Sequence, residues 1–260
     1  MNQRGQQDWR RHLLRLGALL LLCGASLQLY FVARIGLMAV LAPQSTSFQR
    51  SEAWRLLVEK HRIDWRQDWV GDARIAATLK RAVVASEDAG FVDHLGVEWD
   101  ALEKAWEKNQ RAEAAAARRN TQLGQRQGAA STAPKAEPKL VGGSTISQQL
   151  AKNLFLSGER TALRKAQEFV LTLTLEALLS KRRILEIYLN HVEWGEGLFG
   201  AQAAARHYFH TDASRLDAMS AARLAVMLPA PKRFEKNPGS AYVSARAATI
   251  AARMGGVALP

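Results

Sequence analysis

The N-terminal part of the chain is a long apolar run. Residues Leu16–Ala33 carry no charge, and after Arg34 the apolar pattern continues over Ile35–Ala42. A helix of about 20 apolar residues spans the hydrocarbon core of a bilayer. We therefore expect a transmembrane helix within residues 13–42. It either ends before Arg34, whose side chain would then reach toward the interface, or continues past it.

Charges before the run predict its orientation. The residues before the run include one aspartate, Asp8, and four arginines: Arg4, Arg10, Arg11 and Arg15. Positive charge stays on the cytoplasmic side of a membrane, so we expect residues 1–12 to form a cytoplasmic tail and the remainder to face outward. A cleaved signal peptide is the alternative. The apolar run is longer than a typical signal-peptide core and Arg34 interrupts the cleavage region, which favours an uncleaved anchor.

The remaining pattern is mainly helical. Apolar positions at steps of three or four predict a helix over Asp72–Gly90, with Asp72 as its N-cap, and a second helix over Trp99–Ala117. Residues 43–72 have the pattern of a stem with short elements. Alternation of β-branched residues is scarce, so the fold class is mainly α. From Gly142 to about Leu228 the chain again has a compact helical pattern, and residues 241–260 are expected to form a C-terminal helix and tail.

One segment breaks this pattern. Residues 118–140 are polar, small and proline-containing, with no apolar period. Such composition is typical of segments that cannot bury a core. We expect a flexible insertion over about residues 113–140, and strong amide protection across residues 118–140 would contradict it.

Composition narrows the function classes only in part. The 260 residues include 48% hydrophobic residues, one cysteine and a formal charge of +12. This composition supports a folded core and excludes an intramolecular disulfide or a multi-cysteine metal site. Excess positive charge favours an anionic partner, such as nucleic acid, lipid headgroups or a phosphorylated substrate. The predicted outward orientation disfavours nucleic acid.

A pair of acidic residues, Glu87 and Asp88, ends the helix predicted over Asp72–Gly90. A helix C-terminus carries partial negative charge, and a neighbouring carboxylate acts in the same direction. Both effects raise the pKa of Glu87, as a general base near neutrality requires. The alternative is a solvated helix end without chemistry.

A second motif combines Gly142 and Gly143 with a following helix. Ser144 is expected to cap that helix, and a polar stripe follows along one face: Thr145, Gln148, Gln149 and Lys152. A glycine turn feeding a helix N-terminus, with a lysine two turns later, suits a phosphate group. The spacing is not that of a Walker loop. The alternative is a capped surface helix with a solvated polar face.

A third motif gathers cations at the start of a helix over Arg160–Leu179. The charged residues of its first turns are Arg160, Arg164, Lys165 and Glu168. Spacings of three and four place Glu168 beside two of the cations, which suits a polyanion; an ordinary ion-pair network is the alternative. From Phe169 onward the helix is apolar almost all round, so we expect it to cross the core. Glu176 is expected to pair with a basic residue of Lys181–Arg183.

The fourth motif, Ser180–Asn190, is by itself a serine-capped amphipathic helix of structural type. Together the motifs resemble those of a known family, in order: Glu87-Asp88-x-x-Phe91-x-x-His94-x-Gly96, Gly142–Asn153, Arg164-Lys165-x-x-Glu168 and Ser180-Lys181-x-x-Ile184-Leu185-Glu186-x-Tyr188-Leu189-Asn190. Later landmarks also match, at Ala203–Phe209, Leu228–Pro231 and Asn237-Pro238. The chain resembles the lysozyme-like peptidoglycan glycosyltransferases over about residues 73–240.

The resemblance implies a mainly α, lysozyme-like domain with a large head lobe and a small flexible jaw lobe, preceded by one transmembrane helix. No room for a transpeptidase domain follows Pro238, so a monofunctional enzyme is expected. It would polymerise lipid II into β-1,4-linked glycan strands and release undecaprenyl diphosphate.

The resemblance also implies residue roles. Glu87 would be the general base, and Glu168 the second catalytic glutamate and a candidate ligand of a divalent cation (Mg²⁺ or Mn²⁺); no organic cofactor is expected. The implied substrate-binding residues are Asp88, Phe91, His94, Ser144, Thr145, Gln148, Gln149, Lys152, Asn153, Arg160, Arg164 and Lys165.

The implied partners are lipid II, the growing glycan chain, the bacterial inner membrane and other cell-wall synthases or division proteins, without nucleic acid. The enzyme would be single-pass, with a cytoplasmic N-terminus and a periplasmic catalytic domain. Two rival functions use the same residues. A lysozyme-like peptidoglycan-cleaving enzyme would also need a glutamate acid, but it gives no reason for the cations. A non-enzymatic membrane scaffold gives no reason for keeping both Glu87 and Glu168.

Overall fold

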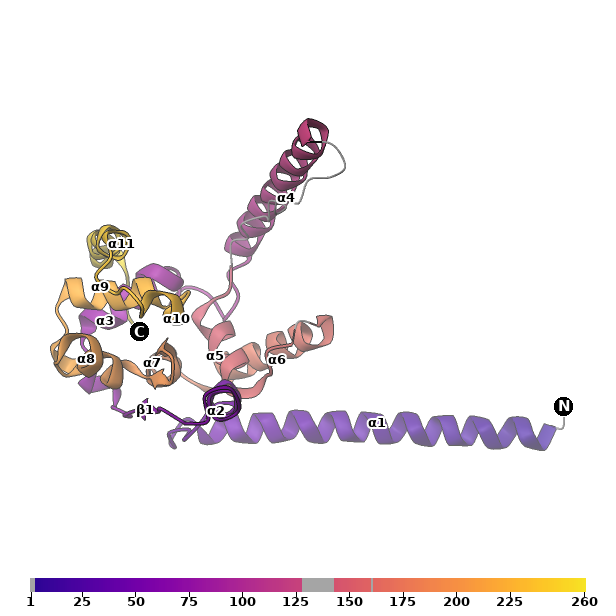
Figure 1. Cartoon of the computed structure of the whole chain (residues 1–260). Helices are drawn as coiled ribbons and strands as arrows, with labels where there is room; N and C mark the ends of the chain where they lie inside the picture. The colour runs from indigo at the N-terminus through magenta and orange to yellow at the C-terminus, as the bar shows by residue number, and fades with distance from the viewer. Residues whose placement is uncertain (1–2, 128–142, 160) are drawn as a thin grey trace.

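The computed structural model describes residues 3–127, 143–159 and 161–260 (Figure 1). Its α-helices, in chain order, are α1 (Gln3–Leu37), α2 (Ser47–Lys60), α3 (Ala77–Glu87), α4 (Trp99–Gln127), α5 (Ile146–Phe155), α6 (Ala162–Leu178), α7 (Lys181–His191), α8 (Ala201–Phe209), α9 (Ala218–Met227), α10 (Pro231–Phe234) and α11 (Ala241–Arg253). Short strands β1 (Arg66–Gln67), β2 (Glu193–Gly195) and β3 (Leu198–Phe199) form one sheet in the order β1-β3-β2. The mainly α class is confirmed.

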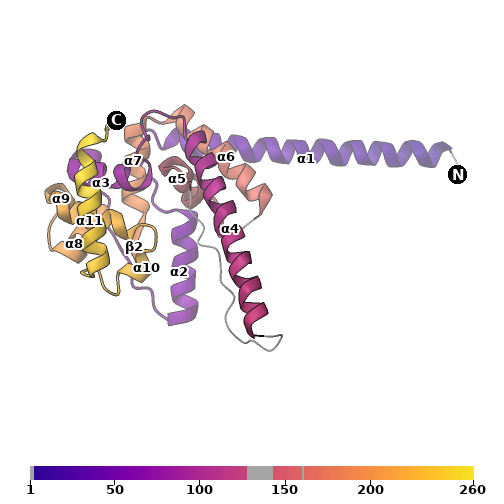
Figure 2. The same cartoon turned by 90° about the horizontal axis from the view of Figure 1, so that it is seen from above.

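Helix α1 is one continuous helix that projects from the rest of the molecule (Figures 1 and 2). Its segment Trp9–Leu37 is long and apolar enough to cross a membrane, with a mean hydropathy of 2.0. The helix continues past Arg34, which decides between the two alternatives left open by the sequence. Arg34 donates a hydrogen bond to the Tyr30 hydroxyl (3.0 Å), so its charge has a polar partner one turn away.

The last turns of α1 belong to the folded domain. Ile35 is fully buried in the main hydrophobic core, and Met38 just beyond the helix is buried with it. Gln28 exchanges hydrogen bonds with Gln167 on α6. Arg183 on α7 donates to the carbonyl oxygen of Met38 (2.7 Å). The anchor is therefore packed onto the domain rather than joined to it by a free linker.

The segment expected to be a stem is also packed into the domain. Thr46 begins α2 with a capping box, in which it and Gln49 satisfy each other's backbone N–H groups. Leu56 on α2 is buried, and α2 packs against α5. Strand β1 pairs in parallel with β3, which lies far along the chain. Residues 43–72 are thus part of the same folded unit.

A buried histidine holds this segment in place. His191, the last residue of α7, is almost fully buried, and its Nε2 donates to the carbonyl oxygen of Pro43 (3.0 Å). Its Nδ1 then accepts a hydrogen bond from Gln67 (3.2 Å). Burial lowers the pKa of His191 to about 4, so the ring is neutral at physiological pH and the two contacts do not require a buried charge.

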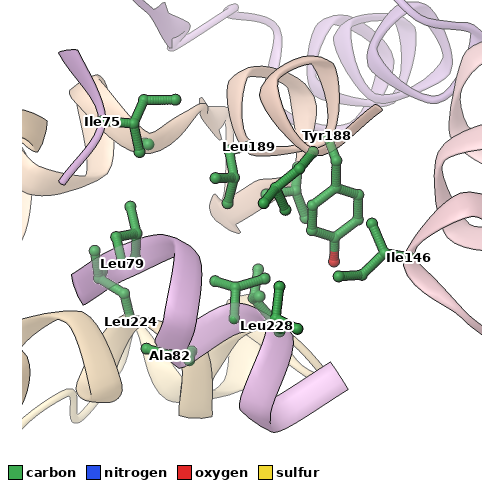
Figure 3. Close-up of a cluster of buried hydrophobic side chains, with 14 of the residues drawn as sticks. Ile75, Leu79, Ala82, Ile146, Tyr188, Leu189, Leu224 and Leu228 are labelled. Atoms are coloured by element: carbon green, nitrogen blue, oxygen red, sulfur yellow. The ribbon is translucent and has the colours of Figure 1, made fainter. Parts of the chain in front are cut away.

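The core is formed where α3, α5, α7 and α9 meet. Figure 3 shows Leu79 and Ala82 of α3, Ile146 of α5 and Leu224 of α9 facing a common interior. Helix α11 covers α9 and α3 with one apolar face, formed by Val243, Ala247 and Ile250. Ser180 caps α7, as the amphipathic pattern predicts.

Three sequence predictions need correction. The helix predicted over Asp72–Gly90 is shorter: Asp72–Arg74 is a 3₁₀ turn and α3 covers Ala77–Glu87. Asp72 does not cap α3, because its carboxylate is paired with Lys80 and Arg182.

Helix α4 continues to Gln127, ten residues beyond the helix end predicted at Ala117, so the start of the expected insertion is helical. Its flexibility stays a prediction. Alanine, arginine and glutamine are good helix formers, and Glu107 pairs with Arg111 one turn on (3.1 Å). Local propensity is therefore sufficient without a buried face. Residues 128–140 of the predicted insertion lie outside the described residues.

Helix α6 does not cross the core with all its faces. Leu171, Thr172 and Leu175 are buried, whereas Val170 and Leu173 are each 42% exposed. The helix therefore has two apolar faces. One face packs on the domain, and the other is exposed.

The packing of Ile35 leads to a prediction about stability. Ile35→Ala should lower the free energy of unfolding of the full chain in detergent by about 2–5 kcal/mol, because it leaves a cavity in the core. Leu20→Ala, at a position of α1 that is 65% exposed, is the matched control and should leave this value nearly unchanged. The measurement is urea unfolding followed by near-ultraviolet circular dichroism. Equal effects of the two substitutions would show that α1 does not pack into the domain.

Candidate active site

A cleft of about 550 Å³ lies between α2, α5, α6 and the turn from α7 into β2. Many of the residues implied by the motifs line it: Ser144, Gln148, Gln149, Lys152, Asn153, Arg164, Lys165 and Glu168. The motif analysis did not select several other lining residues, among them Phe48, Ser51, Val192, Glu193, Leu228 and Pro231. Their only sequence signal is the Leu228–Pro231 landmark, because the others come from segments without a motif.

Helix α5 begins one residue later than expected. Its N-cap is Thr145 rather than Ser144, and Thr145 forms a capping box with Gln148. These two polar side chains are buried and serve the helix terminus. Gln148 also lines the cleft, whereas Thr145 does not. Ser144 is exposed at the cleft, and Gln149 and Lys152 also line it.

Asp88 connects the first motif to the second. Its buried carboxylate accepts hydrogen bonds from the backbone N–H of Ile146 (2.9 Å), at the first turn of α5, and from His94 Nε2 (2.8 Å). A carboxylate at a helix N-terminus is favourable both as a hydrogen-bond acceptor and in the field of the helix. Asp88 therefore holds the start of α5 in place, and His94 supports Asp88. The resemblance had implied that both residues contact the substrate.

Gly96 explains why the first motif ends on a glycine. Its φ is +84°, and a Cβ added there would lie 2.7 Å from Cγ2 of Thr172 on α6. Its N–H donates to His94 Nδ1 (3.0 Å) and its carbonyl oxygen accepts from the Thr145 hydroxyl (2.6 Å). Only glycine permits this conformation and close approach together.

Phe91, an implied substrate contact, is fully buried in the core. The Nζ of Lys181 lies 4.6 Å from its ring centre, and the same Nζ donates to Glu176 (2.8 Å), which confirms the expected partner of Glu176. A buried aromatic ring is unable to contact a ligand in the cleft, so the substrate role expected for Phe91 is replaced by a packing role.

Glu87 ends α3 directly behind the wall of the cleft. Its Oε2 accepts a hydrogen bond from Gln149 Nε2 (2.9 Å), and Gln149 Oε1 accepts one from the Tyr188 hydroxyl (2.9 Å). The pKa of Glu87 is raised, chiefly by desolvation; the hydrogen bond from Gln149 lowers it and the charge of Asp88 raises it. The direction agrees with the sequence argument, but burial rather than the helix terminus is the main cause. The half-buried Glu87 and its hydrogen bond to Gln149 argue against a fully solvated helix end.

The cations of the third motif form the wall built by α5 and α6. Thr161 caps α6, and Glu168 pairs with Arg164 (3.0 Å) and with Lys165. The pKa of Lys152 is lowered, chiefly by desolvation; Glu168 raises it, and Arg164 and Lys165 lower it. Within the described part of the chain, Arg164 Nε is buried without a hydrogen-bond partner. Arg160 lies outside the described residues.

These contacts also test the two acidic sites for a metal ion. Both oxygens of Glu168 are engaged by cations, so Glu168 as arranged does not fit a hard divalent cation, which needs several free oxygen ligands. Asp88, His94 and Glu98 place ligand atoms within 4.8 Å of one another, but both ring nitrogens of His94 are already hydrogen-bonded. No step below depends on a metal, and the expected divalent cation stays a prediction.

Comparison with known proteins identifies the family. The transglycosylase family profile matches residues 57–121 and 122–255. The chain belongs to the transglycosylase family. It is 45% identical to the biosynthetic peptidoglycan transglycosylase of Paraburkholderia phytofirmans over 251 residues, covering 96% of this chain and 94% of that protein. It is 49% identical to that of Burkholderia pseudomallei over 234 residues (90% and 82%) and 47% identical to that of Bordetella pertussis over 240 residues (92% and 91%).

Membership of this family makes glycosyl transfer the chemistry of the site, and the lysozyme-like class expected from the motifs is confirmed. Glycosyl transfer to a hydroxyl acceptor needs a group that takes the acceptor proton and groups that stabilise the departing anion. Glu87, with its raised pKa, is the candidate for the first group, and the cations beside Glu168 are the candidates for the second.

The hydrogen bond between Gln149 and Glu87 predicts a pH effect. It stabilises the ionised carboxylate, so Gln149→Met should raise the pKa of Glu87 further. A general base acts only when ionised, so the acidic limb of the pH profile of kcat/KM for glycosyl transfer should move to higher pH.

Tyr188→Phe is the matched comparison, because the Tyr188 hydroxyl contacts Gln149 and does not contact Glu87. Tyr188→Phe should therefore move the acidic limb of the pH profile less than Gln149→Met does. An unchanged limb in Gln149→Met, with the fold intact by circular dichroism, would remove Glu87 as the group that titrates.

Proposed function

We propose that the chain is a membrane-anchored peptidoglycan glycosyltransferase that polymerises lipid II into β-1,4-linked glycan strands and releases undecaprenyl diphosphate. The observation that carries the proposal is the pairing of two features at one cleft. The desolvated carboxylate of Glu87 accepts a hydrogen bond from Gln149, which lines the cleft. Three cations of α5 and α6 also line it: Lys152, Arg164 and Lys165. The names of the relatives support the same activity.

In the reaction, Glu87 takes the proton from the 4-hydroxyl of the acceptor sugar. The oxygen forms a bond with the anomeric carbon of the growing chain, the bond from that carbon to the diphosphate oxygen breaks, and the configuration at the carbon is inverted. Burial makes Glu87 a stronger base than an exposed glutamate, because it destabilises the ionised form. Gln149 and Tyr188 hold its carboxylate in one orientation.

The cations stabilise the leaving diphosphate. Arg164 has a buried Nε–H without a protein acceptor among the described residues, and a phosphate oxygen is the acceptor that this donor suits. Glu168 holds Arg164 and Lys165 beside each other in the absence of the anion, which limits their mutual repulsion. Desolvation is the main reason that the pKa of Lys152 is lowered, and the charges of Arg164 and Lys165 lower it further. The alternative of an ordinary ion-pair network leaves the Arg164 donor unexplained.

The anchor suits a lipid-linked substrate. A chain whose α1 crosses the bacterial inner membrane, with the arginine-rich end in the cytoplasm and the domain in the periplasm, keeps the cleft near the bilayer that holds the substrate. Glycan, lipid II and membrane are then the partners proposed, together with other cell-wall synthases or division proteins and without nucleic acid.

The test is polymerisation of lipid II by the full chain and by Glu87→Gln. Loss of the base should lower the rate by roughly 10²–10⁴-fold without unfolding the domain. Glu59→Gln is the matched control, because the Glu59 side chain is 58% exposed on α2, and it should keep the normal rate.

Polymer length on a gel gives the readout. A wild-type chain that leaves lipid II unchanged would overturn the proposal. Loss of preformed glycan without polymerisation would indicate the cleaving enzyme, and a Glu87→Gln variant with full activity would remove Glu87 as the base.

A further inference from the structure

A second carboxyl group lines the cleft and has no role in the mechanism above. Glu193 is the first residue of β2 and one of the lining residues. Its side chain is only 8% exposed, and its Oε1 has no hydrogen-bond partner among the residues that the structure describes. A buried polar atom without a partner is costly unless a ligand or water completes it.

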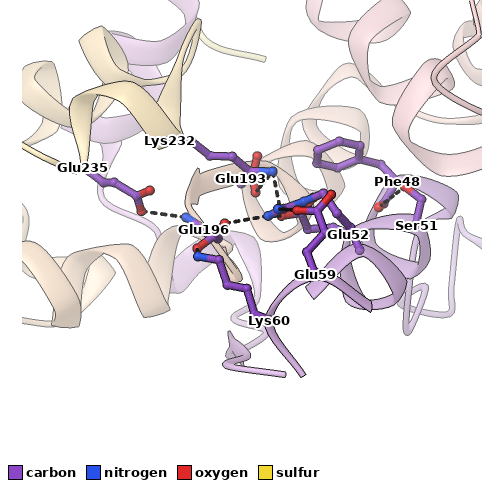
Figure 4. A network of polar contacts seen from close by, with 10 residues as sticks. Phe48, Ser51, Glu52, Glu59, Lys60, Glu193, Glu196, Lys232 and Glu235 are labelled. Carbon is purple, nitrogen blue, oxygen red and sulfur yellow. Dashed lines mark hydrogen bonds and ion pairs between the residues drawn. The ribbon is translucent and has the colours of Figure 1, made fainter. Parts of the chain in front are cut away.

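Neighbouring charges do not satisfy this group (Figure 4). Lys232 is the cation beside it, but its Nζ lies 3.5 Å from Glu193 Oε1 and only 2.6 Å from Glu52. Glu52 is also bound by Arg55, and Glu235 accepts the backbone N–H of Glu196 (2.7 Å).

The charged groups that act on Glu193 are therefore Lys232, Glu52 and Glu235. Desolvation is the main reason that the pKa of Glu193 is raised to about 7. Lys232 lowers it, and Glu52 and Glu235 raise it.

Part of the cleft wall that includes Glu193 is apolar. Phe48 of α2 and Leu228 and Pro231 around the start of α10 line the cleft with it, together with the polar Ser51. An apolar surface with one buried, directional polar group is typical of a site for an uncharged polar ligand. This part of the wall therefore differs in chemistry from the cationic part on α5 and α6. A sugar ring, which has apolar faces and hydroxyl or amide donors at its edge, matches it.

We propose that Glu193 is a substrate-binding residue, whose carboxylate accepts a hydrogen bond from a hydroxyl or amide N–H of a sugar unit of the glycan substrate. The inference rests on the proposed function and deepens it. The cleft then has two parts. The cationic part on α5 and α6 holds the diphosphate, and the part beside Glu193 holds the sugar. Because the contact is made equally before and during the reaction, it acts on binding more than on the chemical step.

The experiment measures initial rates of polymerisation against lipid II concentration, using the full chain. Glu193→Ala should raise KM about 10-fold, the effect of losing one hydrogen bond to a buried acceptor, and leave kcat nearly unchanged. Glu193→Gln keeps an acceptor oxygen and should restore part of the binding. Glu196→Gln is the matched control. Glu196 belongs to the same ion-pair network but is not among the lining residues, so KM should stay at the wild-type value.

A pH series separates binding from structure. In the wild type, KM should rise as the pH falls below about 7, because protonation removes the carboxylate acceptor. In Glu193→Gln this dependence should be absent. Melting temperatures of all variants check the fold.

A third arm uses a lipid-linked disaccharide without the stem peptide. If Glu193 binds sugar, the ratio of KM between Glu193→Ala and wild type is the same for this substrate as for lipid II. A ratio that falls to one would assign the contact to the peptide and overturn the proposal. An unchanged KM in Glu193→Ala, or a loss confined to kcat, would overturn it as well, while wild-type polymerisation leaves the proposed function intact. A wild type without polymerisation would instead reject the proposed function.

Discussion

The carboxylate of Asp88 is the contact on which the site depends. It accepts the backbone N–H of Ile146 at the start of α5 and the Nε2 of His94, so it fixes the start of α5 against the end of α3. Two consequences follow from this one junction. Glu87, the preceding residue, is brought within hydrogen-bond distance of Gln149, and the cation on the next turn of α5, Lys152, is brought to the wall that α6 completes.

Burial gives the charged groups of the cleft their chemistry. Glu87 and Glu193 both have raised pKa values, in each case chiefly because the carboxyl group is desolvated. Their partners differ: Glu87 is held by Gln149, whereas Glu193 has an oxygen without a hydrogen-bond partner among the described residues. The first arrangement suits a base that must keep one orientation. The second suits a group that binds a ligand, so similar burial supports two different roles.

The anchor contributes to structure as well as to location. Ile35 is part of the core, and Gln28 bonds to Gln167, the residue before Glu168. A tether that only held the domain near the membrane would need neither contact. The packing instead fixes α6, and therefore the cationic wall, relative to the apolar helix that is long enough to cross a bilayer.

Much of this could be predicted from the sequence, because the signals are local or lie within one motif. The apolar run of α1 and the pairing of Glu168 with Arg164 and Lys165 depend on spacing along one helix. The direction of the pKa shift of Glu87 was also predicted, but its main cause is desolvation, which comes from tertiary packing. Helix ends were less predictable: Thr145 rather than Ser144 caps α5, because the choice depends on a contact with Gly96 in another segment.

Tertiary structure alone decided which residues reach the cleft. Phe91 belongs to the same motif as Glu87 but is buried in the core, whereas Glu193 belongs to no motif and lines the cleft. The sequence determined the long apolar helix, the helical class, the candidate base Glu87 and the pairing of the cations with Glu168. Which side chains are desolvated, and which are left without a partner, depends on how helices distant in the chain pack together, and no local pattern contains that information.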